Sequence, residues 1–184
     1  MDDGPENGMP AEMTLDDVYD MAIEIEADGR AFYLSAESAC KNSVHKRIFS
    51  ELAAMEADHE LVFSAMKDQA AKAPPAQEAK ELSVVANLFA TGVKEDLAQR
   101  FTGGETSQEI LEKALDFERD TIVFFLSMKR MLDSVPDKSK VDGIVSEELG
   151  HIITLSGAMV RLVSTSVPES APPLQPDDEA RPAT

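Results

Sequence analysis

Residues 23–33 of the chain read IEIEADGRAFY, and residues 56–59 read EADH. This pattern decides the fold because it occurs twice, returning as DFE at residues 116–118 and EELGH at residues 147–151. In each half, 30 residues separate the first glutamate from the second, and a histidine follows the second three positions later. At an offset of 92 residues the repeated residues are Glu26, Glu56 and His59, then Glu118, Glu148 and His151.

The spacing within each half predicts a metal site inside a helical bundle. Residues at i and i+3 share one face of a helix, so each Glu-x-x-His pair presents an oxygen and a nitrogen ligand together. Four inward-facing carboxylates need paired or ligated charge, and two divalent cations would balance them. Oxygen and imidazole ligands suit iron or manganese and also admit zinc. One Glu from each of two helices and Glu-x-x-His from the other two is the pattern of dinuclear carboxylate bundles.

Capping residues and prolines delimit four long helices around these ligands. Thr14 with Asp17, and Thr106 with Glu109, have the spacing of a capping box. Apolar residues keep a helical period after Thr14. We expect helices from Thr14, from about Ser43 to Lys72, from Thr106 to a point before Pro136, and from about Asp137 to Val163.

The remaining segments connect or flank these helices. We expect one domain at residues 14–165, with a crossover at about 73–105 that contains short helices at Leu82–Phe89 and Lys94–Phe101. A connection of this length lets the second and third long helices run in the same direction. Residues 1–13 and 166–184 are polar, acidic and rich in proline, which predicts disorder.

Composition excludes several classes of protein. The 184 residues carry a formal net charge of −18, which disfavours nucleic acid and anionic membranes as partners. Cys40 is the one cysteine, so a disulfide within the chain and a cysteine-ligated metal knot are excluded. The first residues have no signal-peptide pattern, and no apolar run reaches the length of a membrane span. An all-α, cytoplasmic protein is the resulting prediction.

The quoted segments resemble the rubrerythrin branch of the ferritin-like superfamily, over about residues 14–165. The resemblance implies a ferritin-like four-helix bundle of two hairpins, with two iron ions bridged by Glu56 and Glu148. It also implies reactivity with oxygen or hydrogen peroxide, using electrons from Fe(II) or a redox partner. Rubrerythrins commonly form dimers, so the resemblance implies a homodimer as well.

The chain departs from the rubrerythrin pattern at two points. Rubrerythrins carry a rubredoxin-like module with Cys-x-x-Cys pairs, which a single cysteine cannot supply, so the electron donor is expected to be external or Fe(II) itself. Rubrerythrins also use an extra glutamate three residues after the first ligand of the third helix, and this position is Thr121 here. The second departure favours a simpler ferritin-like oxidase or iron-binding protein over an efficient peroxidase.

Three functions therefore compete at this point. The first is an oxidoreductase that oxidises Fe(II) with oxygen or peroxide, in iron homeostasis or oxidative stress, with no catalytic residues beyond the six ligands. The second is a non-catalytic iron-binding or iron-carrying protein whose acidic surface attracts cations. The third is a structural module that holds zinc or no metal and recruits a partner through its tails.

Several other residues have a structural or a functional interpretation. Tyr33 lies seven residues after Glu26 and either donates a hydrogen bond to a ligand carboxylate or only packs. Cys40 is expected to be a small residue near a helix end, and His45 a surface residue. Glu24, Glu60 and Glu147 adjoin ligands and are expected to contact solvent or a ligand side chain rather than metal. On the fourth helix, Gly143, Gly150 and Gly157 recur every seven residues, which predicts cover by the crossover or by a second subunit.

Overall fold

The computed structural model describes residues 14–72 and 104–166, which form four long helices and no strand within those ranges. These helices are α1 (Leu15–Ala39), α2 (Ser43–Ala70), α4 (Ser107–Met131) and α5 (Val135–Ser166). The predicted all-α class is therefore confirmed. The expected crossover helices and most of both terminal tails lie outside the described residues.

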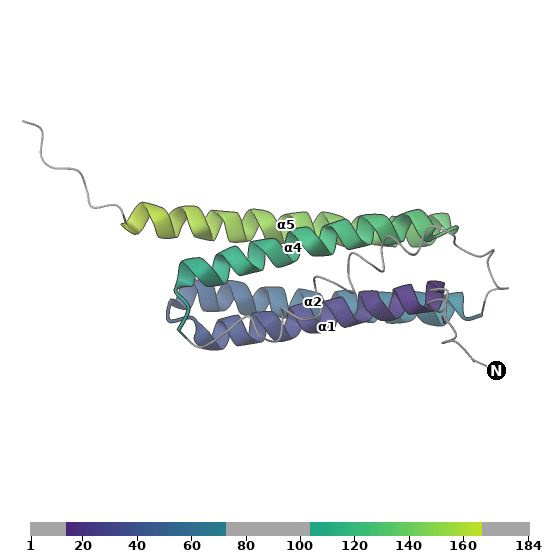
Figure 1. Ribbon diagram of the computed structural model, residues 1–184, viewed down its shortest axis with the longest axis horizontal. Coiled ribbons are helices and arrows are strands. Elements are labelled where there is room, and N and C mark those ends of the chain that lie inside the picture. The colour runs from purple at the N-terminus through teal and green to yellow at the C-terminus, as the bar shows by residue number, and fades with distance from the viewer. Residues whose placement is uncertain (1–13, 73–103, 167–184) are drawn as a thin grey trace, which may run out of the picture.

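The helices pair into two antiparallel hairpins (Figure 1). The main contacts are between α1 and α2 and between α4 and α5, and the hairpins meet along α1 with α4 and α2 with α5. Following the colour of the ribbon shows that α2 and α4 run in the same direction, as the length of the connection predicted. This arrangement places the middle of all four helices at one level of the bundle.

The helix starts follow from local side-chain chemistry. Thr14 and Asp17 form a capping box at the start of α1, and Thr106 and Glu109 form one at the start of α4. At the start of α2, the Asn42 side chain accepts hydrogen bonds from the backbone N–H groups of Val44 and His45. Each of these side chains satisfies backbone donors that the first turn of a helix leaves without partners.

Helix α5 is longer than the sequence predicted. It begins at Val135 rather than near Asp137, because the Ser134 hydroxyl accepts a hydrogen bond from the Asp137 N–H. Pro136 then falls in the first turn, where its missing N–H would have had no partner in the helix. The helix also continues to Ser166 instead of ending at Val163.

The prediction that His45 lies on the surface is wrong, since only 4% of the residue is exposed. Arg161, from the C-terminal part of α5, lies close enough to act electrostatically on it. Burial, together with this arginine, lowers the pKa of the His45 imidazole. A position in the first turn of a helix is therefore interior here, with Arg161 of the other hairpin near it.

Aromatic side chains fill the centre of the bundle. Phe117 stacks on Phe32 with ring centroids 5.9 Å apart and meets Tyr33 edge to face at 6.3 Å. Gly29 allows this packing, because a Cβ atom there would lie 2.8 Å from Phe117 Cε1 and Cζ. The largest fully buried side chains are Tyr19, Tyr33, Phe49, Phe63, Phe117, Phe124, Phe125, Met66, Ile110, Leu111, Met128 and Leu132.

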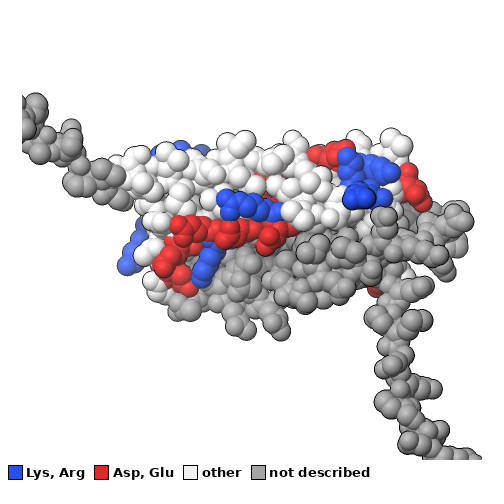
Figure 2. Space-filling model, turned by 45° about the horizontal axis from the view of Figure 1, so that its top comes forward, with Lys and Arg blue, Asp and Glu red and all other residues white. Residues whose placement is uncertain are grey.

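The surface mixes both signs of charge despite the acidic composition (Figure 2). Lys67 of α2 pairs with Asp16 and Asp20 of α1, at 3.1 and 2.5 Å. Lys129 of α4 pairs with Asp142 of α5 at 2.5 Å. These pairs join the helices within each hairpin. Among the described residues, no helix is long and apolar enough to cross a membrane.

The contact between Gly29 and Phe117 predicts opposite effects of alanine at two glycines. Gly29→Ala should lower the free energy of unfolding of the metal-free protein by about 1–2 kcal/mol, because overpacking outweighs the gain in helix propensity. Gly143→Ala is the matched control, since a Cβ there meets no described atom within 4 Å, and it should raise stability by up to about 1 kcal/mol. Urea unfolding followed by circular dichroism measures both. A Gly29→Ala protein as stable as the parent would contradict the assigned contact.

Candidate metal centre

The structure brings all six repeated residues together at the middle of the bundle. Each of the four helices contributes: α1 and α4 one glutamate each, and α2 and α5 one Glu-x-x-His pair each. Their exposed fractions are 3% or less, so the side chains lie in the interior. The residues are Glu26, Glu56, His59, Glu118, Glu148 and His151.

These side chains form two overlapping groups whose ligand atoms lie within 4.8 Å of one another. The His59 position consists of Glu26, Glu56, His59 and Glu148. The His151 position consists of Glu56, Glu118, Glu148 and His151. Glu56 and Glu148 belong to both groups, so each of these carboxylates is placed where it could bridge two ions.

Both imidazoles direct the same nitrogen at the carboxylates. His59 Nδ1 lies 2.9 Å from Glu148 Oε1 and 3.4 Å from Glu56 Oε2. His151 Nδ1 lies 2.8 Å from Glu148 Oε2 and 3.3 Å from Glu118 Oε1. The two rings face each other at an angle of 22° with centroids 5.9 Å apart. The repeat in sequence is therefore a repeat in geometry.

The donor set fits divalent cations. Both carboxylate oxygens of Glu26, Glu56 and Glu148 are buried and accept no hydrogen bond from the described residues. A buried carboxylate without such partners is costly unless a cation ligates it. Four carboxylates carry four negative charges, which two divalent ions would neutralise. The oxygen and nitrogen ligands again suit iron, manganese or zinc.

Proton binding replaces part of this charge balance in the metal-free protein. Burial raises the pKa of the Glu26, Glu56 and Glu118 carboxyls. Burial opposes ionisation of Glu148 too, but the His151 and His59 imidazoles beside it outweigh burial and lower the pKa of Glu148 to about 2. For His151, burial is likewise outweighed by the Glu118 and Glu148 carboxyls beside it, which raise its pKa to about 10.

Two side chains outside the six contact them through hydrogen bonds. The Tyr33 hydroxyl donates to Glu118 Oε1, which decides the choice that the sequence left open for this tyrosine. Glu147 Oε2 lies 3.2 Å from His59 Nε2, so Glu147 contacts a histidine, as one of its expected roles allowed. Both contacts hold the orientation of a candidate ligand.

The other residues singled out from the sequence lie at the margins of the site. Glu60 pairs with Arg30 at 3.3 Å, and Glu24 is exposed. Cys40 is buried after the end of α1, with its Sγ 3.8 Å from Ser107 Oγ. Thr121 is buried near the site, and its hydroxyl has no partner among the described residues.

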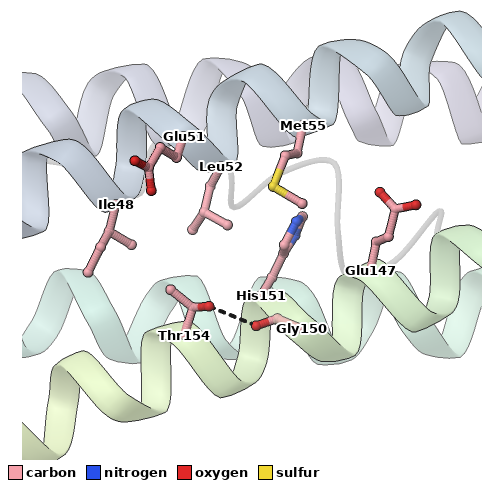
Figure 3. A pocket seen from close by; sticks show the side chains of 8 residues that line it. All are labelled: Ile48, Glu51, Leu52, Met55, Glu147, Gly150, His151 and Thr154. Carbon is pink, nitrogen blue, oxygen red and sulfur yellow. Dashed lines mark hydrogen bonds between the residues drawn. The ribbon is translucent and has the colours of Figure 1, made fainter.

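A pocket of about 260 Å³ lies between α2 and α5 beside His151 (Figure 3). Met55 points towards the His151 ring in this pocket, and the exposed residues Glu51 and Glu147 also line it. Gly150, which contributes no side chain, is part of the same lining. The pocket therefore connects the protein surface with the edge of a buried histidine. Sequence reasoning missed both the pocket and Met55.

Comparisons with known proteins agree with this geometry. The fold matches a solved structure assigned to a ferritin-like diiron-carboxylate protein of Thermotoga maritima, with a TM-score of 0.62. That match has 24% sequence identity and covers 82% of this chain and 97% of the other. The family model for rubrerythrin matches residues 17–96, which include most of α1 and all of α2. No curated protein matches the sequence significantly.

The fold thus defines the class as a ferritin-like four-helix bundle. Within that class, the first hairpin of the chain is similar to rubrerythrin, as the family match over residues 17–96 indicates.

The pKa shifts of the site predict how stability depends on pH. Burial raises the pKa of Glu56 and Glu118, and the pKa of His151 is raised to about 10 despite burial, so the folded apoprotein binds more protons than the unfolded chain and its stability should fall as pH rises from 6.5 to 8. Each proton that only the folded state binds contributes a slope on the order of 1 kcal/mol per pH unit. Glu148 does not oppose this trend, because its lowered pKa acts only in acid.

Anaerobic loading with Fe(II) should weaken this dependence, since ligation replaces the protons. Thermal unfolding of apo and loaded protein at pH 6.5 and 8 measures the effect. The difference in melting temperature between the apo and loaded proteins should be larger at pH 8 than at pH 6.5. An apoprotein whose stability rises over this interval would argue against buried, protonated carboxyls.

Proposed function

We propose that this protein is a di-iron carboxylate protein that oxidises Fe(II) with oxygen or hydrogen peroxide. The observation that carries the proposal is the pair of buried four-residue groups sharing Glu56 and Glu148. Under this proposal, all six residues are metal ligands and the chain holds two iron ions. Manganese and zinc satisfy the same donor chemistry.

Bound iron would supply electrons and open coordination positions at which an oxidant is reduced. The protein's own contribution is to hold the ligands in place. Glu56 and Glu148 are directed at both positions, and His59 and His151 present Nδ1 to one position each. The Tyr33 hydroxyl fixes Glu118, and the surrounding aromatic side chains exclude bulk water.

Fe(II) is the proposed electron donor as well as the metal. Two Fe(II) ions supply the two electrons that, with two protons, reduce one hydrogen peroxide to two water molecules. Thr121 supports Fe(II) as the electron donor, because it occupies the place of the extra glutamate expected of a rubrerythrin peroxidase. The single cysteine of the chain supports it too, since it offers no internal rubredoxin-type donor.

The second candidate is a non-catalytic iron-binding or iron-carrying protein. The net charge of −18 favours this function, because an acidic surface concentrates cations. The two candidates differ in rate: an oxidase converts bound Fe(II) rapidly when the oxidant is added, whereas a carrier retains Fe(II) and oxidises it slowly.

An anaerobic Fe(II) titration followed by rapid mixing with oxygen or peroxide tests the proposal. We expect two Fe(II) per chain and then a yellow-brown ferric absorption that develops in one fast phase. Glu56→Ala and Glu148→Ala should each abolish the fast phase while circular dichroism retains the helical content, since each removes a carboxylate shared by both positions. Glu112→Ala, at an exposed glutamate of α4, is the matched control and should react like the parent.

Other outcomes of this experiment exclude the proposal. Saturation at one Fe(II) per chain would rule out a dinuclear site. Slow colour after complete loading would favour the carrier, and no iron uptake would favour a zinc or metal-free module. A Glu56→Ala protein that oxidises Fe(II) at the parent rate would remove Glu56 from the site.

We also propose that the protein forms a homodimer through α5. Large apolar side chains recur on one face of α5 at Leu149, Ile153 and Val160, with exposed fractions of 49%, 73% and 64%. The second subunit that would cover the glycines at 143, 150 and 157 would pack next to this face. The cytoplasmic location stays a prediction from the sequence.

Light scattering of the parent and of Ile153→Glu tests the dimer. The parent should have the mass of two chains, and the variant the mass of one, because a buried unpaired charge destabilises an apolar interface. Leu61→Glu, at a similarly exposed leucine of α2, should remain dimeric. A monomeric parent at micromolar concentrations would overturn the proposal.

A further inference from the structure

The two halves of the site differ in the residues just behind the ligands. At the offset of 92 that relates the halves, Glu147 corresponds to Met55, and Phe125 corresponds to Tyr33. The candidate ligands are the same in both halves. Each of these two pairs, in contrast, has a polar side chain in one half and an apolar side chain in the other. The chemical difference between the metal positions therefore lies in residues that contact the ligands.

The first difference concerns the outer nitrogens of the histidines. His59 Nε2 lies 3.2 Å from a carboxylate oxygen of Glu147. His151 Nε2 is buried and has no partner among the described residues, and Met55 lies beside its ring in the pocket of Figure 3. When Nδ1 binds a metal, the neutral ring carries its proton on Nε2. His59 can therefore donate that proton to a carboxylate, whereas the thioether of Met55 is only a weak acceptor.

The second difference concerns the carboxylates that belong to one position only. Tyr33 donates its hydroxyl proton to Glu118 of the His151 position. The corresponding Phe125 has no hydroxyl to offer to Glu26 of the His59 position. A donated hydrogen bond stabilises the charge on a carboxylate and makes it a weaker donor to a metal, while a carboxylate behind an imidazole makes that ring a stronger donor.

Both differences strengthen metal binding at the His59 position relative to the His151 position. We propose that the two metal positions are inequivalent and fill in order: the ion at the His59 position binds first and more tightly, and the ion at the His151 position binds second and more weakly. Glu147 is the positioning residue responsible for the stronger first site. This inference rests on the proposed dinuclear site but not on the oxidation of Fe(II).

The pocket lies beside the histidine of the position that binds second. It reaches His151 and is lined by the exposed carboxylates of Glu51 and Glu147, which attract cations at its opening. Gly150 and the flexible Met55 side chain leave room beside the ring. The outer edge of the His151 ring thus borders a pocket and has no hydrogen-bond partner among the described residues.

Calorimetric titration of the apoprotein with Co(II), without any oxidant, tests the order of filling. We expect two steps in the parent, the first at least tenfold tighter than the second. Glu118→Ala changes only the His151 position and should retain the tight step, whereas Glu26→Ala changes only the His59 position and should lose it. The reverse assignment of the steps would overturn the proposal.

Exchanging the residues behind the histidines tests the cause. Glu147→Met should weaken the first step about tenfold and leave the second unchanged, and Glu147→Gln, which keeps an acceptor oxygen, should restore most of the difference. Met55→Glu should tighten the second step by a similar factor, with Met55→Leu as the matched control that behaves like the parent. Melting temperatures of the apoproteins identify variants that fail to fold.

Three results would contradict this mechanism. The first is a parent protein whose two Co(II) ions bind with identical affinity. The second is a Glu147→Met protein in which both steps weaken equally, which would indicate a structural role. The third is a Met55→Leu protein that changes the second step as much as Met55→Glu does. Since no oxidant is present, none of these results depends on whether the protein oxidises Fe(II).

Discussion

Four carboxylates buried at one level of a helical bundle are the constraint on which the rest of this structure depends. Each glutamate lies on a different helix, and their exposed fractions are 1% or less. Such groups repel one another and lose hydration, so the folded chain needs compensating positive charge between them. In the metal-free protein, protons and two histidines supply it, and divalent cations are the alternative. The stability of the bundle and the occupancy of the site are therefore coupled.

The surrounding core is arranged to tolerate this charge. Large aromatic rings fill the bundle around the site, and Gly29 allows the Phe117 ring to approach α1 closely. The Tyr33 hydroxyl gives Glu118 a hydrogen bond inside this apolar region. The packing thus keeps water away from the carboxylates, which strengthens their preference for a cation. The same residues support the fold and the proposed chemistry.

Duplication explains both the symmetry of the site and its departures from symmetry. Two similar hairpins supply equivalent ligand groups, with both histidines presenting Nδ1 to the centre. The residues behind the ligands have diverged, as Glu147 and Met55 show. Divergence at these positions changes the strength of a ligand without removing it. A site built from two copies can in this way acquire two metal positions with different properties.

The sequence by itself determined the helix starts and which six side chains lie together at the middle of the bundle. The capping pairs Thr14 with Asp17 and Thr106 with Glu109 act over three residues, and the Glu-x-x-His spacing acts over one helical turn, so both can be read locally. The repeat then predicted which residues would meet. Pro136 marked the start of α5 less accurately, because the Ser134 cap places this proline inside the first turn.

Only the tertiary structure decided which partners the ligands have across the bundle. The Tyr33 hydroxyl meets a glutamate 85 residues away, and Glu147 meets a histidine 88 residues away. His45 is buried with Arg161 of α5 near it, and the pocket beside His151 depends on the spacing of α2 and α5. These features follow from the relative rotation and level of separate helices. The hydrophobic periodicity of a helix constrains which face it buries. The exact register of the helix against its neighbour is set by the packing of the whole core.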